Sequence, residues 1–294
     1  MKRVFSILAF LLCVLVVNAQ TDNIVRKQSQ KRTTTQTTTA AKKQTTTTKP
    51  AKKTSATTSS TNSNRQRILQ ELADHMVYVQ GGTFTMGATN EQGSDAYDSE
   101  KPAHSVTLSS YYIGKTEVTQ DLWQAVMGSN PSEFKGNRKP VEHVSWDDCQ
   151  TFISKLNSLT GKKFRLPTEA EWEFAARGGI KSKGYEYSGS NTLDDVAWYW
   201  YNSGLTTHDV GTKNPNELGL YDMSGNVWEW CNDWYGNYSS SPSNNPTGPS
   251  SGTLRVFRGG SWCFEARVCR SYFRHNFTPD NRSSNLGLRL CLSE

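Results

Sequence analysis

The chain has 294 residues, 35% hydrophobic and 20% charged, which supplies enough apolar material for one large domain or two small ones. Beyond the first 20 residues no apolar run approaches the roughly 20 residues that span a bilayer, so we do not expect an integral membrane protein. Of the net charge of +6, Lys2 and Arg3 supply +2 and residues 21–64 supply +8, which leaves −4 for residues 65–294. The positive charge therefore gives no support for nucleic-acid binding by the folded part.

Residues 1–19 have the pattern of an export signal. The basic residues Lys2 and Arg3 precede an apolar run over 4–17, and small residues then stand at the positions that favour cleavage after Ala19. We expect an exported mature protein, either secreted or located in the periplasm or cell envelope. Such compartments permit disulfides.

Residues 20–64 are rich in Thr, Lys and Gln and contain almost no large apolar side chains. Such a segment cannot bury enough surface to offset its chain entropy, so we expect a disordered linker. It is interpreted as a solvated spacer; a tether to anionic wall or membrane material and a site of O-linked sugar are alternatives. Residues 65–294 are expected to form one folded domain.

The first part of this domain shows both strand and helix patterns. Residues 65–74 predict a short helix, and the alternation over 76–87 around Gly81-Gly82 predicts a hairpin. Two further strands are expected within 104–119. The apolar spacing over 119–127 predicts a helix.

Two more helices have clear start signals, and the rest of the chain has little periodicity. Ser145 is placed as the N-cap of an amphipathic helix, with Asp148 at its third position. Thr168 and Glu171 form a capping box at the start of another. Beyond Gly179 the many Gly, Asn and Trp residues predict irregular backbone, which must be held by aromatic packing, bound cations or disulfides.

Several motifs carry the identity of the chain: RLPTEAEWE at 165–173, GLYDMSGNVWEW at 219–230, RGGSW at 258–262, TPD at 278–280 and SNLGLR at 284–289. Together and in this order, they closely resemble the sulfatase-modifying-factor family, which includes the formylglycine-generating enzymes. The resemblance covers about residues 76–292. It implies a single α+β domain of low regular secondary structure, related to C-type lectins.

The resemblance implies a calcium site in the segment 219–230. The matching ligands are the Asp222 side chain, the Gly225 and Val227 carbonyls, and the Glu229 side chain. Calcium prefers several hard oxygen ligands, and a Gly-rich loop can turn its carbonyls toward an ion. In the alternative interpretation, the two carboxylates bind backbone amides without a metal.

The resemblance also implies a copper site. In formylglycine-generating enzymes two thiolates after Gly-Gly-Ser bind Cu(I), and a substrate cysteine in a Cys-x-Pro-x-Arg segment is oxidised to formylglycine. Ser261, Cys263 and Cys269 are the candidate catalytic residues, and the two cysteines are the candidate copper ligands. Cys269 matches the family's second cysteine, eight residues beyond Ser261. Cys263 lies one residue short of the first position, which Phe264 occupies, and the segment up to Thr278 is three residues shorter than in the enzyme.

The predicted mature chain has an odd number of cysteines, so at least one thiol stays unpaired within a single chain. Cys149 is expected to be a buried free thiol, because it lies on the apolar face of a helix. The spacing leaves open whether Cys263 and Cys269 bind a metal, form a local disulfide or pair elsewhere. The five are Cys149, Cys231, Cys263, Cys269 and Cys291.

Three functions from different classes remain. The first is an exported copper-dependent oxidase acting on a Cys-x-Pro-x-Arg segment of a protein or peptide. The second is a non-catalytic module of the cell envelope that binds or assembles another envelope protein. The third is a lectin-like carbohydrate binder, for which Trp198, Trp200 or Trp234 would provide the aromatic platform.

Overall fold

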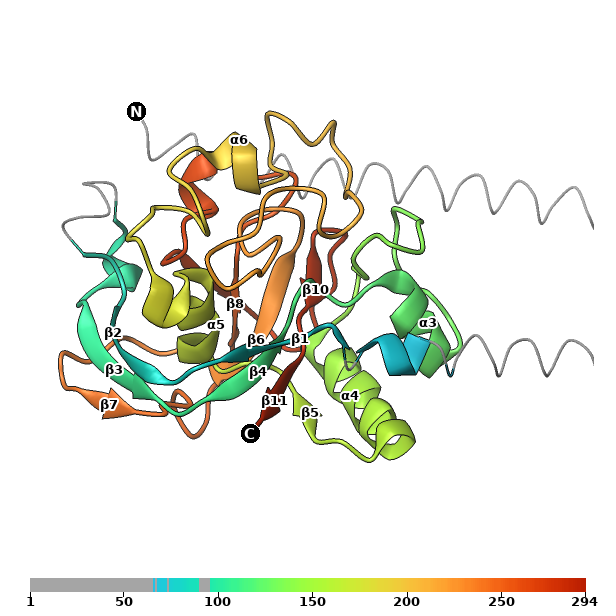
Figure 1. Ribbon diagram of the computed structural model, residues 1–294, viewed down its shortest axis with the longest axis horizontal. Coiled ribbons are helices and arrows are strands. Elements are labelled where there is room, and N and C mark those ends of the chain that lie inside the picture. The colour runs from blue at the N-terminus through green and yellow to red at the C-terminus, as the bar shows by residue number, and fades with distance from the viewer. Residues whose placement is uncertain (1–65, 67, 73, 90–95) are drawn as a thin grey trace, which may run out of the picture. The chain divides into compact units, whose positions relative to one another are not determined.

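Three β-sheets organise the domain (Figure 1). The computed structural model describes residues 66, 68–72, 74–89 and 96–294, so the predicted export signal and linker lie outside the described residues. The first sheet has the order β1 (Met76–Val79), β4 (Tyr111–Gly114), β11 (Cys291–Ser293) and β5 (Phe164–Arg165). The second has the order β10 (Leu286–Leu288), β6 (Trp228–Trp234), β8 (Arg255–Arg258) and β9 (Arg274–Phe277). The third has the order β2 (Gly82–Met86), β3 (His104–Leu108) and β7 (Ser243–Asn244).

The predicted hairpin over 76–87 is wrong, because its two strands do not pair with each other. β1 pairs with β4 and β2 pairs with β3, both antiparallel, so residues 76–86 and 104–114 form one long bent ladder. At the bend, a Cβ on Gly81 would lie 2.4 Å from the carbonyl oxygen of Leu108. Gly81 therefore permits close approach of two backbones and does not form a tight turn.

The helix predictions are confirmed. α3 (Gln120–Met127) follows Thr119, and residues 68–72 are helical. Capping boxes start α4 (Trp146–Thr160) at Ser145 and α5 (Glu169–Ala176) at Thr168, where each side chain accepts a hydrogen bond from the third amide of its helix. The shorter helical segments are η2 (Asp98–Glu100), η3 (Gly179–Lys181), α6 (Leu193–Val196) and η4 (Ala266–Val268).

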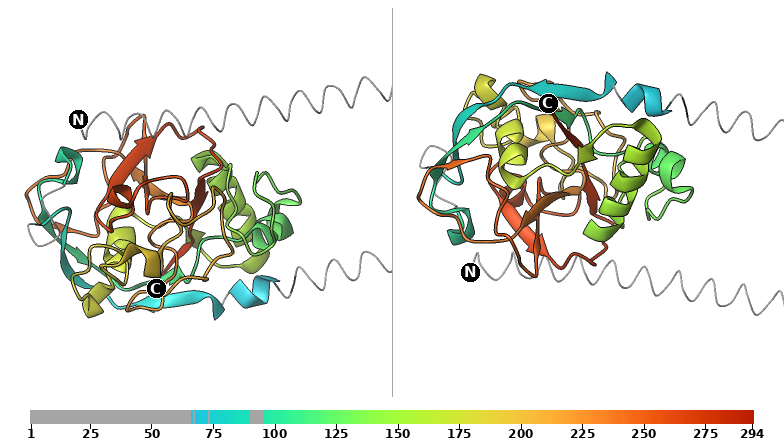
Figure 2. Two further views of the ribbon diagram at one scale, coloured as in Figure 1. Left: turned by 90° about the horizontal axis from the view of Figure 1, so that it is seen from above. Right: turned by 90° about the horizontal axis from the view of Figure 1, so that it is seen from below.

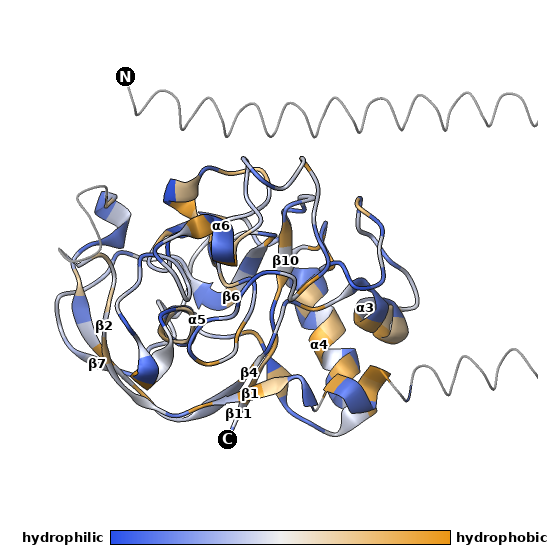
Figure 3. Cartoon of the chain, turned by 45° about the horizontal axis from the view of Figure 1, so that its top comes forward, coloured by the Kyte–Doolittle hydropathy of each residue, from blue (hydrophilic) through white to orange (hydrophobic). Residues whose placement is uncertain are grey.

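The helices divide the core into two main clusters. α3 and α4 pack together on one flank (Figures 1 and 3). The buried face of α4, with Cys149, Phe152 and Leu156, belongs to the core cluster that also contains Trp228 and Trp230. α5 contacts β2, β3, β6 and β8 and fills the other cluster around Trp172. The views from above and below show α3 and α4 at one end of the domain and β2 and β3 at the other (Figure 2). The domain is thus α+β, as predicted.

No helix within the described ranges is both long and apolar enough to cross a membrane.

A buried acid in the loop before α4 gives stability a pH dependence. Glu142 is fully buried, and its Oε1 accepts a hydrogen bond from the Phe134 amide at 2.8 Å. Its Oε2 has no hydrogen-bond partner among the described residues. Burial raises the pKa of Glu142 from 4.5 to about 8. Between these values the folded state holds a proton that the unfolded state has lost, so stability falls as pH rises through this window.

We therefore predict that Glu142→Gln raises the free energy of unfolding at pH 8 by roughly 1–2 kcal/mol and has little effect at pH 5. Urea unfolding at both pH values measures this difference. Glu265→Gln, at an exposed position, is the control and should change neither value. Equal effects of Glu142→Gln at both pH values would contradict the assignment of a proton to Glu142.

Candidate functional site

The segment 219–230 forms a tight loop that leads into β6. Asp222, Gly225 and Asn226 have φ values of 58°, 84° and 56°, in the left-handed region. A Cβ on Gly225 would lie 2.4 Å from the carbonyl oxygen of Trp198, so only glycine fits without displacing that backbone. Backbone hydrogen bonds of Asn226 to Trp198 and to Trp262 join this loop to the Gly-Gly-Ser segment. The two motifs predicted from sequence are therefore adjacent.

Glu229, a predicted calcium ligand, forms a buried ion pair with Arg289 of the last family motif. Both side chains have no exposed surface, and Arg289 donates from Nε and Nη2 to both carboxylate oxygens, at 2.7–3.1 Å. Trp172 Nε1 donates to Glu229 Oε2 at 2.7 Å. Arg289 also donates to the carbonyls of Gly114 and Tyr221. Glu229 could bind a cation only by giving up one of these contacts.

Asp222, the other predicted carboxylate ligand, has one oxygen available. Its Oδ2 accepts a hydrogen bond from the Gly211 amide at 2.7 Å, whereas buried Oδ1 has no hydrogen-bond partner among the described residues. Burial, opposed by the Gly211 amide and Arg289 and reinforced by Glu229, raises the pKa of Asp222 to about 6. An orphaned carboxylate oxygen at this place fits the predicted cation.

A third carboxylate, Glu117, was missed from sequence. It accepts hydrogen bonds from the Asn226 side chain and the Val227 amide, at 3.1 and 3.2 Å. Burial, with Asp222 and Glu229 nearby, raises its pKa well above the usual range. Arg289 is the cation that counters these three acids in the described interactions. The site thus holds an excess of buried carboxyl groups, which a proton or a bound cation would relieve.

Cys263 and Cys269, the candidate copper ligands, lie close together beside Ser261. Cys263 Sγ is 3.7 Å from Ser261 Oγ, and it accepts a hydrogen bond from the Asn285 side chain at 3.2 Å. The Cys269 thiol donates to the Glu265 carbonyl at 3.8 Å, and Ser261 and Cys263 both influence its pKa. The structure therefore brings the three predicted catalytic residues into one neighbourhood.

Both thiols are buried. Cys263 is 2% exposed and Cys269 is fully buried, and a Cβ on Gly260 would lie 2.5 Å from Cys269 Sγ. Burial raises the pKa of Cys269 to about 12, so its thiolate is disfavoured at neutral pH. Phe264, at the family's first cysteine position, packs against Trp228 at a centroid distance of 5.5 Å.

None of the five cysteines of the described domain forms a disulfide, and all five are buried, including Cys149 as predicted. The local disulfide considered for Cys263 and Cys269 is not formed. Burial also raises the pKa values of Cys149, Cys231 and Cys291 well above the usual range. These three act as packing residues in the two main core clusters.

The tryptophans proposed as a sugar platform are in different surroundings. Trp198 is covered by the His208 ring at 3.7 Å, and Lys213 lies over it at 4.2 Å. The Arg255 guanidinium lies 3.4 Å from the Trp234 ring centroid. Trp200 is 39% exposed. Of the three candidates, Trp200 is thus the ring with a substantially exposed side chain, whereas Trp198 and Trp234 each carry a cation on one face.

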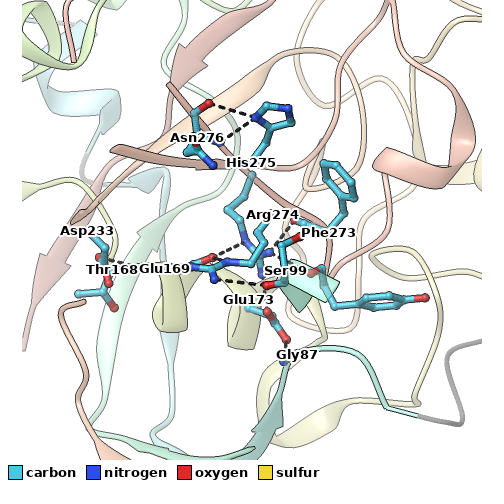
Figure 4. Close-up of polar contacts among 12 residues, drawn as sticks. Gly87, Ser99, Thr168, Glu169, Glu173, Asp233, Phe273, Arg274, His275 and Asn276 are labelled. Carbon is cyan, nitrogen blue, oxygen red and sulfur yellow. Dashed lines mark hydrogen bonds and ion pairs between the residues drawn. The ribbon is translucent and has the colours of Figure 1, made fainter. Parts of the chain in front are cut away.

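Buried arginine–glutamate pairs hold the irregular second half of the domain, and sequence gave no signal for their pairing. Arg258 pairs with Glu173 of α5, and Arg270 pairs with Glu100 at 2.8 Å. Arg274 pairs with Glu169 of α5 at 2.5 Å (Figure 4). Each pair joins segments at least 85 residues apart, so no local spacing reveals it.

We predict that Arg289→Met lowers the free energy of unfolding by about 3–5 kcal/mol, because it leaves Glu229 buried without its counter-charge. Denaturant unfolding measures the loss. Arg282→Met is the matched control, because Arg282 pairs with Asp148 at the surface, and it should cost less than about 1 kcal/mol. Adding Glu229→Gln to Arg289→Met should recover part of the loss. Similar costs for the two single variants would contradict this assignment.

The chain is similar in sequence to several known proteins. The chain is 36% identical over 273 residues to the chaperone protein LppX of Paenibacillus barcinonensis, covering 76% of this chain and 91% of that protein. It is 32% identical over 282 residues to the formylglycine-generating enzyme of Streptomyces coelicolor, covering 72% and 87%.

Solved structures agree with this result. Treponema denticola variable protein 1 superposes with a TM-score of 0.69 at 37% identity, covering 74% of this chain and 95% of that one. PvdO from Pseudomonas aeruginosa gives a TM-score of 0.65 at 28% identity, covering 74% and 94%. The sulfatase-modifying factor enzyme 1-like domain matches residues 60–293. On this evidence, and on the motifs that meet around Glu229 and Ser261, the chain belongs to the sulfatase-modifying factor family.

Proposed function

We propose that this protein is a non-catalytic member of its family, an exported binding module that holds unfolded or partly folded polypeptide in the cell envelope. The observation that carries the proposal is the burial of both Cys263 and Cys269. A Cu(I) centre needs thiolates that a substrate thiol and oxygen can reach. Here the pKa of Cys269 is about 12, and Phe264 packs in the core where the family places its first cysteine. These surroundings do not fit a copper site.

An exposed apolar surface lies beside the buried thiols and supports polypeptide binding. Trp200, Tyr201 and Leu205 are 39%, 74% and 53% exposed, and we call them the 200–205 patch. Its backbone is attached to the segment that contains Cys263, because the Trp200 amide donates to the Phe264 carbonyl at 3.0 Å. Exposed large apolar side chains gathered in one short segment are typical of interaction surfaces.

The relatives also support this assignment. LppX carries the name of a chaperone protein, and its match covers a similar share of the chain, 76%, to that of the formylglycine-generating enzyme of Streptomyces, 72%. The same fold therefore occurs under both names, and a binding role requires no redox centre. The basic and apolar pattern of residues 1–19 supports export of this module.

The runner-up function is the oxidation of a Cys-x-Pro-x-Arg segment to formylglycine. It is favoured by one observation, the juxtaposition of Ser261, Cys263 and Cys269. A glycan ligand has less support, because Trp198 and Trp234 are covered by basic side chains.

The proposed binding function predicts that the protein suppresses aggregation of an unfolded, carboxymethylated test protein and leaves the thiol of a Cys-x-Pro-x-Arg peptide unchanged. Light scattering measures the first result, and mass spectrometry after incubation with Cu(I) in air measures the second. Trp200→Ser and Tyr201→Ser should weaken suppression several-fold, because they remove apolar contact area.

Two variants serve as controls for this experiment. Ile180→Ser removes an equally exposed apolar side chain, 52% exposed, outside the 200–205 patch and should keep full activity. Cys269→Ser should also keep suppression. Conversion of the peptide thiol to an aldehyde, abolished by Cys269→Ser, would replace our proposal with the oxidase function.

We further propose that calcium binds at the 219–230 loop through Asp222 Oδ1 and the carbonyls of Gly225 and Val227. Glu229 is held by Arg289 and orients the loop; it would join as a ligand only by releasing one of its present partners. The orphaned, buried Asp222 oxygen supports this site. The bound calcium ion would have a structural role, because its charge would hold several oxygen atoms of the loop in place.

If calcium binds there, calcium added to protein stripped with a chelator should raise the melting temperature, by mass action on the folded state. At a concentration about 100-fold above Kd, the gain in stability is about 2.7 kcal/mol. Asp222→Ala should abolish the shift, whereas Asp209→Ala, at an exposed nearby position, should retain it. An unchanged melting temperature in the folded native protein, or a shift that Asp222→Ala preserves, would rule out this site.

A further inference from the structure

The N-terminal part of the domain leaves a long sheet edge open. Among the described strands, β1 pairs only with β4 and β2 pairs only with β3, so residues 76–86 run along the outside of the bent ladder. β1, in cyan, follows the border of the domain in both views of Figure 2. Such an edge presents backbone N–H and C=O groups to any chain that can approach it.

The hydrogen bonds of β4 show which groups of β1 face outward. On one side of β4, the Gly114 amide donates to the Leu290 carbonyl at 2.8 Å, next to β11. On the other side, the Lys115 amide donates to the His75 carbonyl at 2.7 Å, next to β1. Backbone groups alternate in direction along an antiparallel pair. It follows that alternate residues along β1, counted from His75, face β4.

Met76 and Tyr78 consequently direct their N–H and C=O groups away from the sheet. No hydrogen-bond partner for these groups is found in the part of the chain that the structure describes. Tyr78 is 47% exposed, and its ring packs against that of Tyr112 on β4 at a centroid distance of 5.4 Å. The open edge thus combines unpaired backbone groups with aromatic surface beside them.

Other sheet edges of the described domain are occupied or short. On β9, the Asn276 amide donates to His275 Nδ1 at 2.8 Å, so this donor is already satisfied (Figure 4). On β10, the Leu288 carbonyl accepts a hydrogen bond from the Val118 amide at 2.9 Å. β5 and β7 have two residues each. The edge of β1 is therefore a better template for an added strand than these four edges.

This edge also lacks charged side chains and proline, the residues that commonly protect sheet edges. Natural proteins place lysine, other charged residues or proline on exposed edges, because these prevent pairing with other chains. Residues 76–88 contain no charged residue and no proline. The edge can therefore recognise an extended backbone without selecting for charge.

We infer that the open edge of β1 binds an extended segment of another polypeptide, which adds to the first sheet as a further strand. Backbone hydrogen bonds to Met76 and Tyr78 supply the affinity, and side chains of the added strand pack beside the Tyr78 ring. The ligand rests on the proposed function, which supplies unfolded polypeptide. The surface itself is separate from the 200–205 patch.

A second copy of this chain fits the edge less well than a flexible segment does. A stable dimer needs roughly 1,200 Å² or more of buried surface. β1 has four residues and is followed by the bend at Gly81, so pairing with a second β1 buries much less than this. A flexible segment needs only to adopt the extended conformation.

Peptides that differ only in N-methylation test this inference with the native full-length protein. The parent probe is a fluorescein-labelled, acetylated hexapeptide of alternating Thr and Val. Methylating its three Val amides blocks one edge of the peptide and leaves the Thr amides free on the other, because alternate amides face opposite edges. Methylating all six amides blocks both edges. By fluorescence anisotropy, we expect the first methylated peptide to bind like the parent and the second to bind at least roughly tenfold more weakly.

The key variant is Tyr78→Pro. It removes the outward N–H and leaves the hydrogen bonds to β4 in place, because proline is tolerated where the N–H of an edge strand faces solvent. It should weaken binding of the parent peptide at least roughly tenfold, with an unchanged circular dichroism spectrum. Tyr78→Val keeps the N–H and a high strand propensity, so this matched control should retain most of the binding. If Tyr78→Pro does not fold, the comparison of the two methylated peptides still decides.

Equal binding of the two methylated peptides, equal binding by folded Tyr78→Pro and Tyr78→Val, or no binding by the native protein would overturn the inference. A dimer in sedimentation velocity that Tyr78→Pro converts to a monomer would also overturn it, because the edge would then belong to a second copy. Trp200→Ser should leave binding of the hexapeptide unchanged while it weakens suppression of aggregation. Peptide binding by a native protein that does not suppress aggregation would overturn the proposed function and support this inference.

Discussion

The buried pair of Arg289 and Glu229 is the interaction on which the rest of the domain depends. One guanidinium reaches the carboxylate on β6, the carbonyl of Gly114 at the end of β4 and the carbonyl of Tyr221 in the 219–230 loop. The same carboxylate accepts the indole N–H of Trp172 from α5. Two sheets, a helix and a loop therefore meet at one ion pair. Removing these two charges from water is costly. The pair can be buried because its contacts satisfy nearly all hydrogen-bond donors of Arg289 and acceptors of Glu229.

Further buried arginine–glutamate pairs occur along the irregular half of the chain. α5 turns both Glu169 and Glu173 inward, one helical turn apart, and each receives an arginine from the β8–β9 region. Arg270 reaches Glu100 in the same way. Irregular backbone cannot satisfy its own polar groups through long ladders, so it needs partners from side chains. Arginine suits this purpose because its planar fork can bind a carboxylate and several carbonyls at once.

This dependence explains what could be predicted from sequence. The helices at Ser145 and Thr168 were predictable because their start signals are local, within four residues. The hairpin at 76–87 failed because each strand pairs with a partner about 18–38 residues away, and alternation alone does not specify that partner. Ser261, Cys263 and Cys269 were predictable as neighbours through the family motif. Glu117 could not be predicted as a site residue. It accepts a hydrogen bond from Val227, which lies 110 residues away in the sequence, so only the folded chain brings it to the site.

The arrangement of arginines also bears on the proposed binding role, because it fixes the Gly-Gly-Ser region without a metal. The segment from Ser261 to Thr278 is fixed at two points, by Arg270 on Glu100 and by Arg274 on Glu169. Neither point involves a thiol or a metal. Cys263 and Cys269 therefore contribute packing and hydrogen bonds to a segment whose position is set by ion pairs. A chain that keeps its carboxylate–arginine frame can therefore vary its cysteines and still hold the exposed side chain of Trp200 in place.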